Sequence, residues 1–264
     1  MIQRSFDVKS ESDLQKLADI KFYSEYASSK SVFVQIYVSR FSAEDAQKVA
    51  NAVLQVIPHA KIVGMSLYGD PFVGLNVEKL LKFNFCFFEE SDVTILDYDG
   101  EKQSLEEIIA DFRKKLSQTA DAKGVLLLGS GITFKISRFM EEVTREHKDI
   151  PFFGSVGNIN TADINDQAPY AFGNHVIRNG IVAVIFSGKN LHFYSESLFS
   201  WKPIGKEMRV EAGIPGEIGD SVIKTIDGLP ATQIYKKYLD VDPDAHFISN
   251  ICEFPLVVNR NGYL

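Results

Sequence analysis

Hydrophobic and polar positions in the first third of the chain alternate between strand and helix patterns. Residues 32–39 form an apolar run rich in β-branched and aromatic side chains, which predicts a strand. Ser42, with Asp45 three residues later, then indicates a helix start, and apolar residues recur at helical spacing until Pro58. The pattern further predicts a short buried strand and then two strands paired as a hairpin, at residues 61–67, 83–88 and 93–98.

The same order of elements recurs further along the chain. Ser104 and Glu107 form a capping box that predicts another helix, and Asn179-Gly180 predicts a hairpin turn near the end of the series. Between and beyond them the pattern predicts strands at 124–129, 151–155, 170–177, 180–187 and 191–197, and a helix at 136–143.

The recurrence predicts an internal duplication. A strand, a helix, a strand ending in glycine and then paired strands occur at residues 32–98 and again at residues 125–197. We therefore predict a mixed α/β fold of two repeated units, each a mixed sheet covered by helices. Chance recurrence of common α/β units is the alternative interpretation.

A glycine-rich stretch at residues 211–219 is the best domain boundary. It divides a main domain at residues 31–215, preceded by a helical lead-in at 1–30, from a shorter segment at 216–264. That segment predicts a strand, a helix with Pro230 in its first turn and one more strand. It resembles the start of a second domain that is cut short, so we expect the natural chain to continue past Leu264.

Composition narrows the class of protein. The chain has 264 residues, 45% hydrophobic and 24% charged, and its net charge of −7 argues against nucleic acid and anionic membranes as partners. No apolar run approaches the ~20 residues of a membrane span, and the N-terminus lacks the apolar core of a signal peptide. We therefore expect a cytoplasmic location. Cys86 and Cys252 lie too far apart to suggest a disulfide framework or a metal site.

Catalytic signatures are missing from the sequence. No serine lies in a G-x-S-x-G elbow, and the histidines are scattered without metal-ligand spacing. We expect no catalytic residue, no metal and no cofactor. A hydrolase or transferase acting at the strand ends stays open as an alternative, and a structural adaptor would need a large exposed apolar face.

Two predicted strand ends are the best candidate ligand site. Residues 64–70 and 154–158 each leave a buried strand and enter a polar loop, and ligands in α/β sheets bind at strand ends. Simple turns are the alternative. If the units are copies, the two ends face each other across a pseudo-two-fold axis, and their groups suit a zwitterion such as an amino acid. The predicted contacts are Gly64, Ser66, Asp70, Gly154, Ser155 and Asn158, with Arg40 and Ser130 at the rim and Trp201 as an aromatic wall.

Several motifs resemble those of the FIST family over about residues 32–239. The clearest are IPFFGSVGN at 150–158, AFGNHVIRNGIVAVIFSG at 171–188, LFSWKPIGKEMRV at 198–210 and IDGLPATQIYKKYL at 226–239. The chain departs from the family pattern at Phe153, Asn158 and Ser200, where the family usually has glycine, an acidic residue and glycine.

The resemblance implies a sensory module rather than an enzyme. FIST domains precede output domains of bacterial signalling proteins, such as diguanylate cyclases, histidine kinases and chemoreceptors, and amino acids are among their suggested ligands. By this resemblance the partners would be a small molecule and a covalently attached output domain. The oligomeric state stays open.

Overall fold

The computed structural model divides the chain into two compact units. The first comprises Met1–Asn160 and Asn165–Ser195, and the second comprises Thr161–Ile164 and Glu196–Leu264. The structure describes residues 1–8, 13, 29–39, 41–67, 80–131, 133–157, 169–194, 205–212, 223–244, 247–251, 254 and 256.

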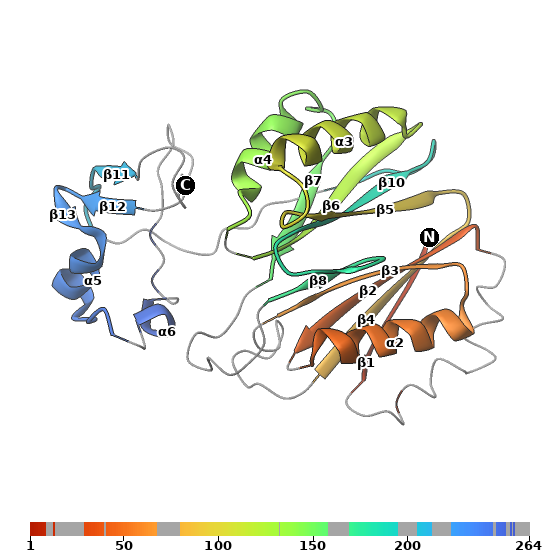
Figure 1. Ribbon diagram of the computed structural model, residues 1–264, viewed down its shortest axis with the longest axis horizontal. Coiled ribbons are helices and arrows are strands. Elements are labelled where there is room, and N and C mark those ends of the chain that lie inside the picture. Colours follow the sequence, from red (N-terminus) through yellow and green to blue (C-terminus); the bar gives the residue numbers. More distant parts are fainter. Residues whose placement is uncertain are drawn as a thin grey trace. The chain divides into compact units, whose positions relative to one another are not determined.

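A six-stranded sheet, called the first sheet, begins at the N-terminus of the first unit (Figure 1). All neighbouring strands are antiparallel except β2 and β3, which are parallel because α2 (Ala43–Val56) connects them. The order is β1 (Ile2–Val8), β4 (Leu80–Phe88), β2 (Ser31–Ser39), β3 (Ala60–Ser66), β8 (Ala171–Phe172) and β9 (Val176–Ile177).

A four-stranded sheet, called the second sheet, contains the next part of the chain. Its helices α3 (Leu105–Gln118) and α4 (Ile136–Thr144) share an apolar cluster with one face of the sheet. Strands β6 and β7 are parallel, and the other pairs are antiparallel. The order is β5 (Asp92–Asp99), β10 (Gly180–Ser187), β6 (Ala122–Ser130) and β7 (Phe152–Val156).

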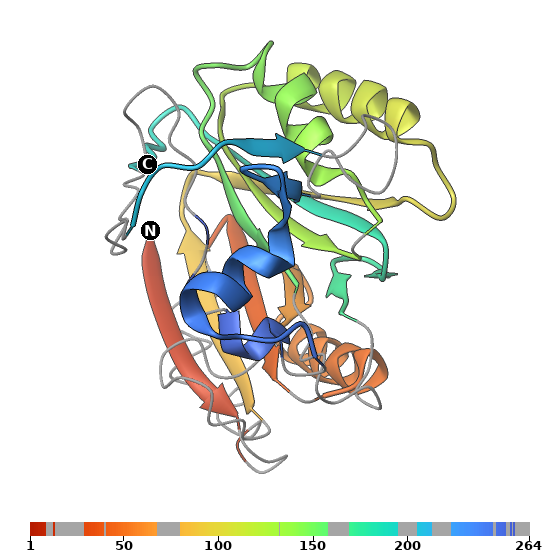
Figure 2. The ribbon, with the colours of Figure 1, turned by 90° about the vertical axis from the view of Figure 1, so that its left-hand side faces the viewer.

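The two sheets pack face to face between two helical layers (Figures 1 and 2). Helix α2 covers the outer face of the first sheet, where Phe83 and Phe85 are fully buried. Between the sheets, the Phe186 ring lies 5.0 Å from Phe33 and 6.3 Å from Phe88, measured between centroids. Because both faces of the central strands are covered, strands such as β10 are buried throughout and almost entirely apolar.

The predicted helix starts are confirmed. The Ser42 hydroxyl accepts a hydrogen bond from the Asp45 backbone N–H at 2.9 Å. Ser104 and Glu107 form the reciprocal capping box, with the Glu107 carboxylate accepting the Ser104 backbone N–H at 2.8 Å. Each cap satisfies backbone donors that the first helical turn leaves unpaired, and this fixes where the helix begins.

The two sheets share strand order and register. The order β1-β4-β2-β3 in the first sheet corresponds to β5-β10-β6-β7 in the second. Two copies of one unit remain our prediction, and this correspondence supports it. Equivalent pairs are Ile36–Gly64 and Leu127–Gly154, Val38–Leu81 and Gly129–Ile181, and Arg4–Phe85 and Thr94–Ile185.

The predicted hairpin of residues 83–88 and 93–98 is wrong. Strands β4 and β5 belong to different sheets, and the polar turn between them carries the chain across the sandwich. The Ser31 hydroxyl donates to the Ser91 carbonyl at 2.8 Å and holds this crossing. The strand order therefore groups β5 with the second sheet and β1 with the first, whereas the predicted halves 32–98 and 125–197, which stay a prediction, place β5 in the first half.

Three other expected elements differ. Strands β8 and β9 form their own hairpin in the first sheet instead of pairing with β10, and residues 191–194 are not a strand. Phe193 instead packs on Gly124 and on the Phe186 ring, at 5.4 Å from its centroid. In the expected helical lead-in at 1–30, residues 2–8 form β1, and all but four of the remaining residues lie outside the described ranges.

The second unit contains a small sheet and two short helices. Its buried residues include Ile226, Ile234 and Tyr235. The predicted boundary at residue 216 falls between β11 and β12, two strands that pair with each other in this sheet. The assignment of 216–264 to a second domain that is cut short stays a prediction. The elements are β11 (Val210–Ala212), β12 (Ile223–Ile226), β13 (Leu229–Pro230), α5 (Ala231–Leu239) and α6 (Phe247–Ile251).

The capping box generates a prediction for stability. Ser104→Ala removes the hydroxyl that caps α3, and we expect it to lower the free energy of unfolding by about 1 kcal/mol. Ser117→Ala, an exposed serine in the last turn of the same helix, is the control and should change it by less than about 0.5 kcal/mol. Urea denaturation measures both, and equal effects would contradict the role of the cap.

Candidate functional site

The predicted strand ends meet in the structure. The backbone N–H of Leu67, just after β3, donates to the Val38 carbonyl at 2.8 Å, and that of Gly157, just after β7, donates to the Gly129 carbonyl at 2.8 Å. These two bonds are equivalent in the two sheets. A side chain at Gly157 would place its first carbon 3.4 Å from the Ser66 carbonyl oxygen. The two loops that follow β3 and β7 therefore start from neighbouring points.

The two glycines of the predicted site have packing roles. A side chain at Gly64 would collide with the Ile36 carbonyl and the Phe172 ring. Gly154 has φ +146°, and a side chain there would collide with the Leu127 carbonyl on the neighbouring strand. Only glycine permits such a backbone conformation and such close approach, so the fold itself explains both residues.

Two of the predicted serine contacts hold the β8–β9 hairpin. The Ser66 hydroxyl accepts the Tyr170 backbone N–H at 2.9 Å and lies 3.2 Å from the Tyr170 carbonyl, to which it donates. The Ser130 hydroxyl is buried and donates to the Ile177 carbonyl at 2.7 Å. Ser155 lies exposed on β7. Of the three serines, Ser155 is therefore the accessible one.

The remaining predicted contacts lie outside the described residues. They are Arg40, Asp70, Asn158 and Trp201.

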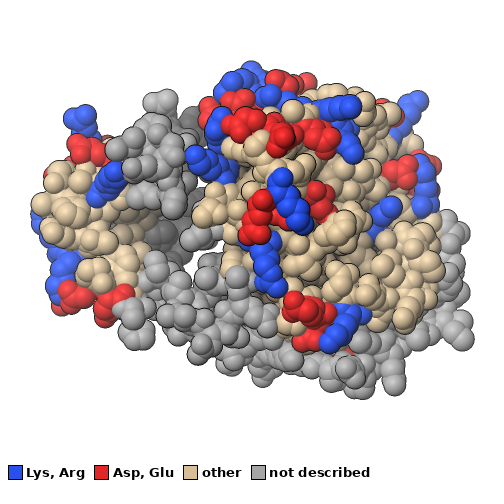
Figure 3. Space-filling view, viewed as in Figure 1, with Lys and Arg blue, Asp and Glu red and all other residues tan. Residues whose placement is uncertain are grey.

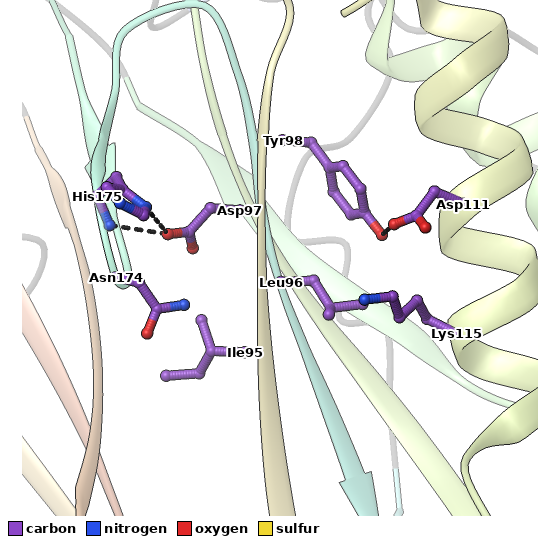
Figure 4. A pocket seen from close by; sticks show the side chains of 8 residues that line it. All are labelled: Ile95, Leu96, Asp97, Tyr98, Asp111, Lys115, Asn174 and His175. Atoms are coloured by element: carbon purple, nitrogen blue, oxygen red, sulfur yellow. Dashed lines mark hydrogen bonds and ion pairs between the residues drawn. The ribbon is translucent and has the colours of Figure 1, made fainter.

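A depression of about 220 Å³ lies along edge strand β5 (Figure 4). Its walls come from the two opposite faces of that strand. Asp97 turns toward the β8–β9 hairpin, whereas Tyr98 turns toward α3 and donates to the Asp111 carboxylate at 2.9 Å. Because the strand separates the two groups, they do not act on one ligand.

Asp97 secures the turn of the hairpin. One carboxylate oxygen accepts the His175 backbone N–H at 2.7 Å and lies 3.3 Å from the His175 ring Nδ1, and the Asn174 backbone also donates to Asp97. The other oxygen is buried, has no hydrogen-bond partner among the described residues and packs against Gly173. Burial raises the pKa of Asp97, and the bonds from His175 and Asn174 oppose that rise.

Sequence reasoning missed a group of polar side chains on the first sheet. We call it the polar face: Gln3 and Ser5 on β1, Asn84 and Cys86 on β4, and Gln35 and Tyr37 on β2. They point toward the side of the sheet that the second sheet covers in part, opposite the buried phenylalanines under α2. An available signal was the alternation of Lys82, Asn84 and Cys86 with buried residues on a central strand, where asparagine is disfavoured.

The polar face is joined by hydrogen bonds across three strands. The Asn84 carbonyl oxygen accepts from Gln3 at 2.7 Å and from the Ser5 hydroxyl at 3.0 Å. Its amide nitrogen donates to the Gln35 carbonyl oxygen at 3.2 Å, and the Gln35 amide donates to the Tyr37 hydroxyl at 3.2 Å. Beside this network, Lys82 and Asp7 form an ion pair at 2.7 Å.

The described part of the chain shows no feature of a metal or nucleic-acid site. Within it, no group of histidine, cysteine and acidic side chains is placed to hold a metal ion. Acidic and basic residues are intermixed on the face that Figure 3 shows, without the single-sign patch typical of nucleic-acid binding. None of the helices it describes has the length and hydropathy that a membrane crossing requires.

One protein family model matches the chain. The model of the FIST N domain family matches residues 32–229, which is more than half of the chain. No curated protein matches it.

The hydrogen bonds that Asp97 accepts from the hairpin turn lead to a prediction about the stability of the protein and its pH dependence. Asp97→Ala leaves two backbone donors of the turn without their acceptor, and we expect a loss of about 1–3 kcal/mol of unfolding free energy. Asp97→Asn keeps an acceptor and should lose less.

The pH dependence follows from the raised pKa of Asp97. The folded protein binds this proton more tightly than the unfolded chain, whose aspartate pKa is about 3.9. The stability of the wild type relative to Asp97→Asn should therefore rise as pH falls through the raised pKa toward about 4. Urea denaturation between pH 7 and pH 4 measures it, and a relative stability that falls with pH would contradict the raised pKa.

Proposed function

Because the chain belongs to the FIST N domain family, we propose that it is the ligand-binding part of a signal transduction protein, with a small polar molecule as its signal. The family is a sensory domain family rather than a catalytic one. The observation that supports small-molecule binding in this chain is the meeting of two equivalent strand ends, at Ser66 and Gly157. Strand ends are where open α/β sheets hold their ligands.

An amino acid is the ligand class favoured by the residues that follow these strands in the sequence. Asp70 follows β3 by a few residues, Asn158 follows Gly157 directly, and Arg40 follows Ser39 at the end of β2. A carboxylate for an ammonium group and a guanidinium for a carboxylate make a complementary pair for a zwitterion. We propose that these three residues and Ser155 bind it, and that the protein acts in the cytoplasm.

The proposed signal is a change in the packing of the two sheets. A ligand between equivalent strand ends would contact both sheets at once, so it would bind one arrangement of the sheets more tightly than another. The covalently attached output domain would then respond to that arrangement. Coupling of this kind requires differential affinity for the two arrangements, whatever the total affinity.

A thermal-shift screen tests the proposed function. A ligand that binds only the folded protein stabilises it by about 2.7 kcal/mol at a concentration 100 times its Kd. We expect at least one amino acid to raise the melting temperature in a concentration-dependent way. If no amino acid or other small polar metabolite does so, the proposed function is wrong.

Asp70→Asn tests the proposed ammonium contact. The change keeps the size of the side chain and removes its charge, so we expect an amino acid to bind more weakly by roughly 1.5–3 kcal/mol, with folding almost unchanged. Asp149→Asn, an exposed aspartate before β7, is the matched control and should leave the affinity as it is. Isothermal titration calorimetry measures both, and an unchanged affinity in Asp70→Asn would exclude the contact.

A further inference from the structure

The corresponding faces of the two sheets differ in chemistry. The shared register aligns the β2 and β4 residues of the polar face with positions in β6 and β10 of the second sheet. There the side chains are apolar and buried in the contact between the sheets. The pairs of equivalent positions are Gln35 and Leu126, Tyr37 and Leu128, Asn84 and Val184, and Cys86 and Phe186.

The fold does not require polar side chains at these positions. Leucine and valine occupy the equivalent places in the second sheet, with the same strand order and register. Asparagine and glutamine in a central strand lose packing area and strand propensity. Natural sequences depart from such local preferences mainly at functional positions. The polar face is therefore a candidate for binding.

The polar face is partly exposed, and one of its donors has no acceptor among the described residues. Gln3 and Ser5 are exposed, whereas Gln35, Tyr37 and Asn84 are half-buried. The Tyr37 hydroxyl accepts a bond from Gln35, and no described residue accepts a bond from its own O–H. Burial raises the pKa of Tyr37, so the O–H stays in place at neutral pH as a donor.

The position of the polar face links it to the strand ends. Tyr37 pairs with Met65 in the ladder between β2 and β3, one residue before Ser66. The Tyr37 side chain lies on the face that it shares with the buried Met65, whereas the Ser66 side chain lies on the opposite face, because side chains alternate along a strand. The polar face therefore reaches the β2–β3 ladder one residue before the end of β3.

The groups on the polar face define a ligand class. Its amides and hydroxyls are neutral and offer both donors and acceptors, and the adjoining Asp7 and Lys82 form an ion pair with each other. Such a surface favours a molecule without net charge that carries several donors and acceptors. Burial raises the pKa of the Cys86 thiol to about 11, so this thiol is protonated at neutral pH and offers no nucleophile.

We propose that the polar face, with Gln35, Tyr37 and Asn84 at its centre, binds a small polar ligand without net charge through reversible hydrogen bonds. This inference rests on the proposed function, because it names a second surface on which the sensory domain would hold its ligand. Free amino acids, which are zwitterions, and uncharged polyols share this chemistry.

The test compares probes and variants on the full chain. The uncharged or zwitterionic probes are L-glutamine, L-serine and myo-inositol, and the charged probes are succinate and putrescine. The double variant Gln35→Leu/Asn84→Val takes its side chains from the equivalent positions of the second sheet, so we expect it to fold with unchanged or higher melting temperature. Tyr37→Phe removes only a hydroxyl, and Gln55→Leu, on the exposed side of α2, is the matched control.

We expect at least one net-neutral probe to bind the wild type. Its affinity should fall tenfold or more in the double variant and should also fall in Tyr37→Phe. Its affinity should be unchanged in Gln55→Leu. Calorimetry gives these affinities. Binding of the charged probes alone, or an affinity in both polar-face variants within twofold of the wild type, overturns the inference.

Failure of the inference differs from failure of the proposed function. If a net-neutral probe binds the wild type and the polar-face variants equally but is lost in Asp70→Asn, the proposed function holds and the ligand sits only at the strand ends. If no probe binds the wild type, both are overturned.

Discussion

The apolar contact between the two sheets is the constraint on which the rest of the structure depends. The Phe186 ring meets both Phe33 and Phe88 from the opposite sheet, and the inner faces of β6 and β10 are buried there. Helices bury the outer faces. Since hydrophobic burial is the main favourable term in folding, most of both sheets must stay apolar. Polar recognition is therefore confined to strand ends, sheet edges and the part of the first sheet that carries the polar face.

The β8–β9 hairpin joins the two halves of the chain into one unit. It lies between β7 and β10 in sequence, yet it pairs with β3 of the first sheet. Ser66 and Ser130 bind its backbone, and Asp97 binds its turn. Side chains with hydroxyls at strand ends look the same in sequence whether they bind a ligand or a backbone group. Here the hydroxyls of Ser66 and Ser130 form hydrogen bonds with backbone groups of the hairpin segment.

In the duplication that we propose, one half would keep its packing while the other takes on recognition. The second sheet places leucine and valine where the first has Gln35 and Asn84, at equivalent positions in the same strand order. A sensory domain needs both a stable core and a surface that responds to a ligand. If the polar face binds as we propose, the difference between the two sheets would meet both needs within the domain that matches the family at residues 32–229.

The sequence by itself determined the local elements, because their signals act between near neighbours. Ser42 and Ser104 start their helices through bonds to residues three positions away, and apolar runs mark the strands. The sequence also contains the family motifs, and its pattern predicted the two strand ends that meet in the structure. The tertiary structure alone decided strand partners, since a short polar link such as the one after Phe88 serves a hairpin and a crossing between sheets equally well. It also decided which polar residues are occupied, as in Ser130, and which remain accessible, as in Asn84, because burial and hydrogen bonding depend on segments far apart in the chain.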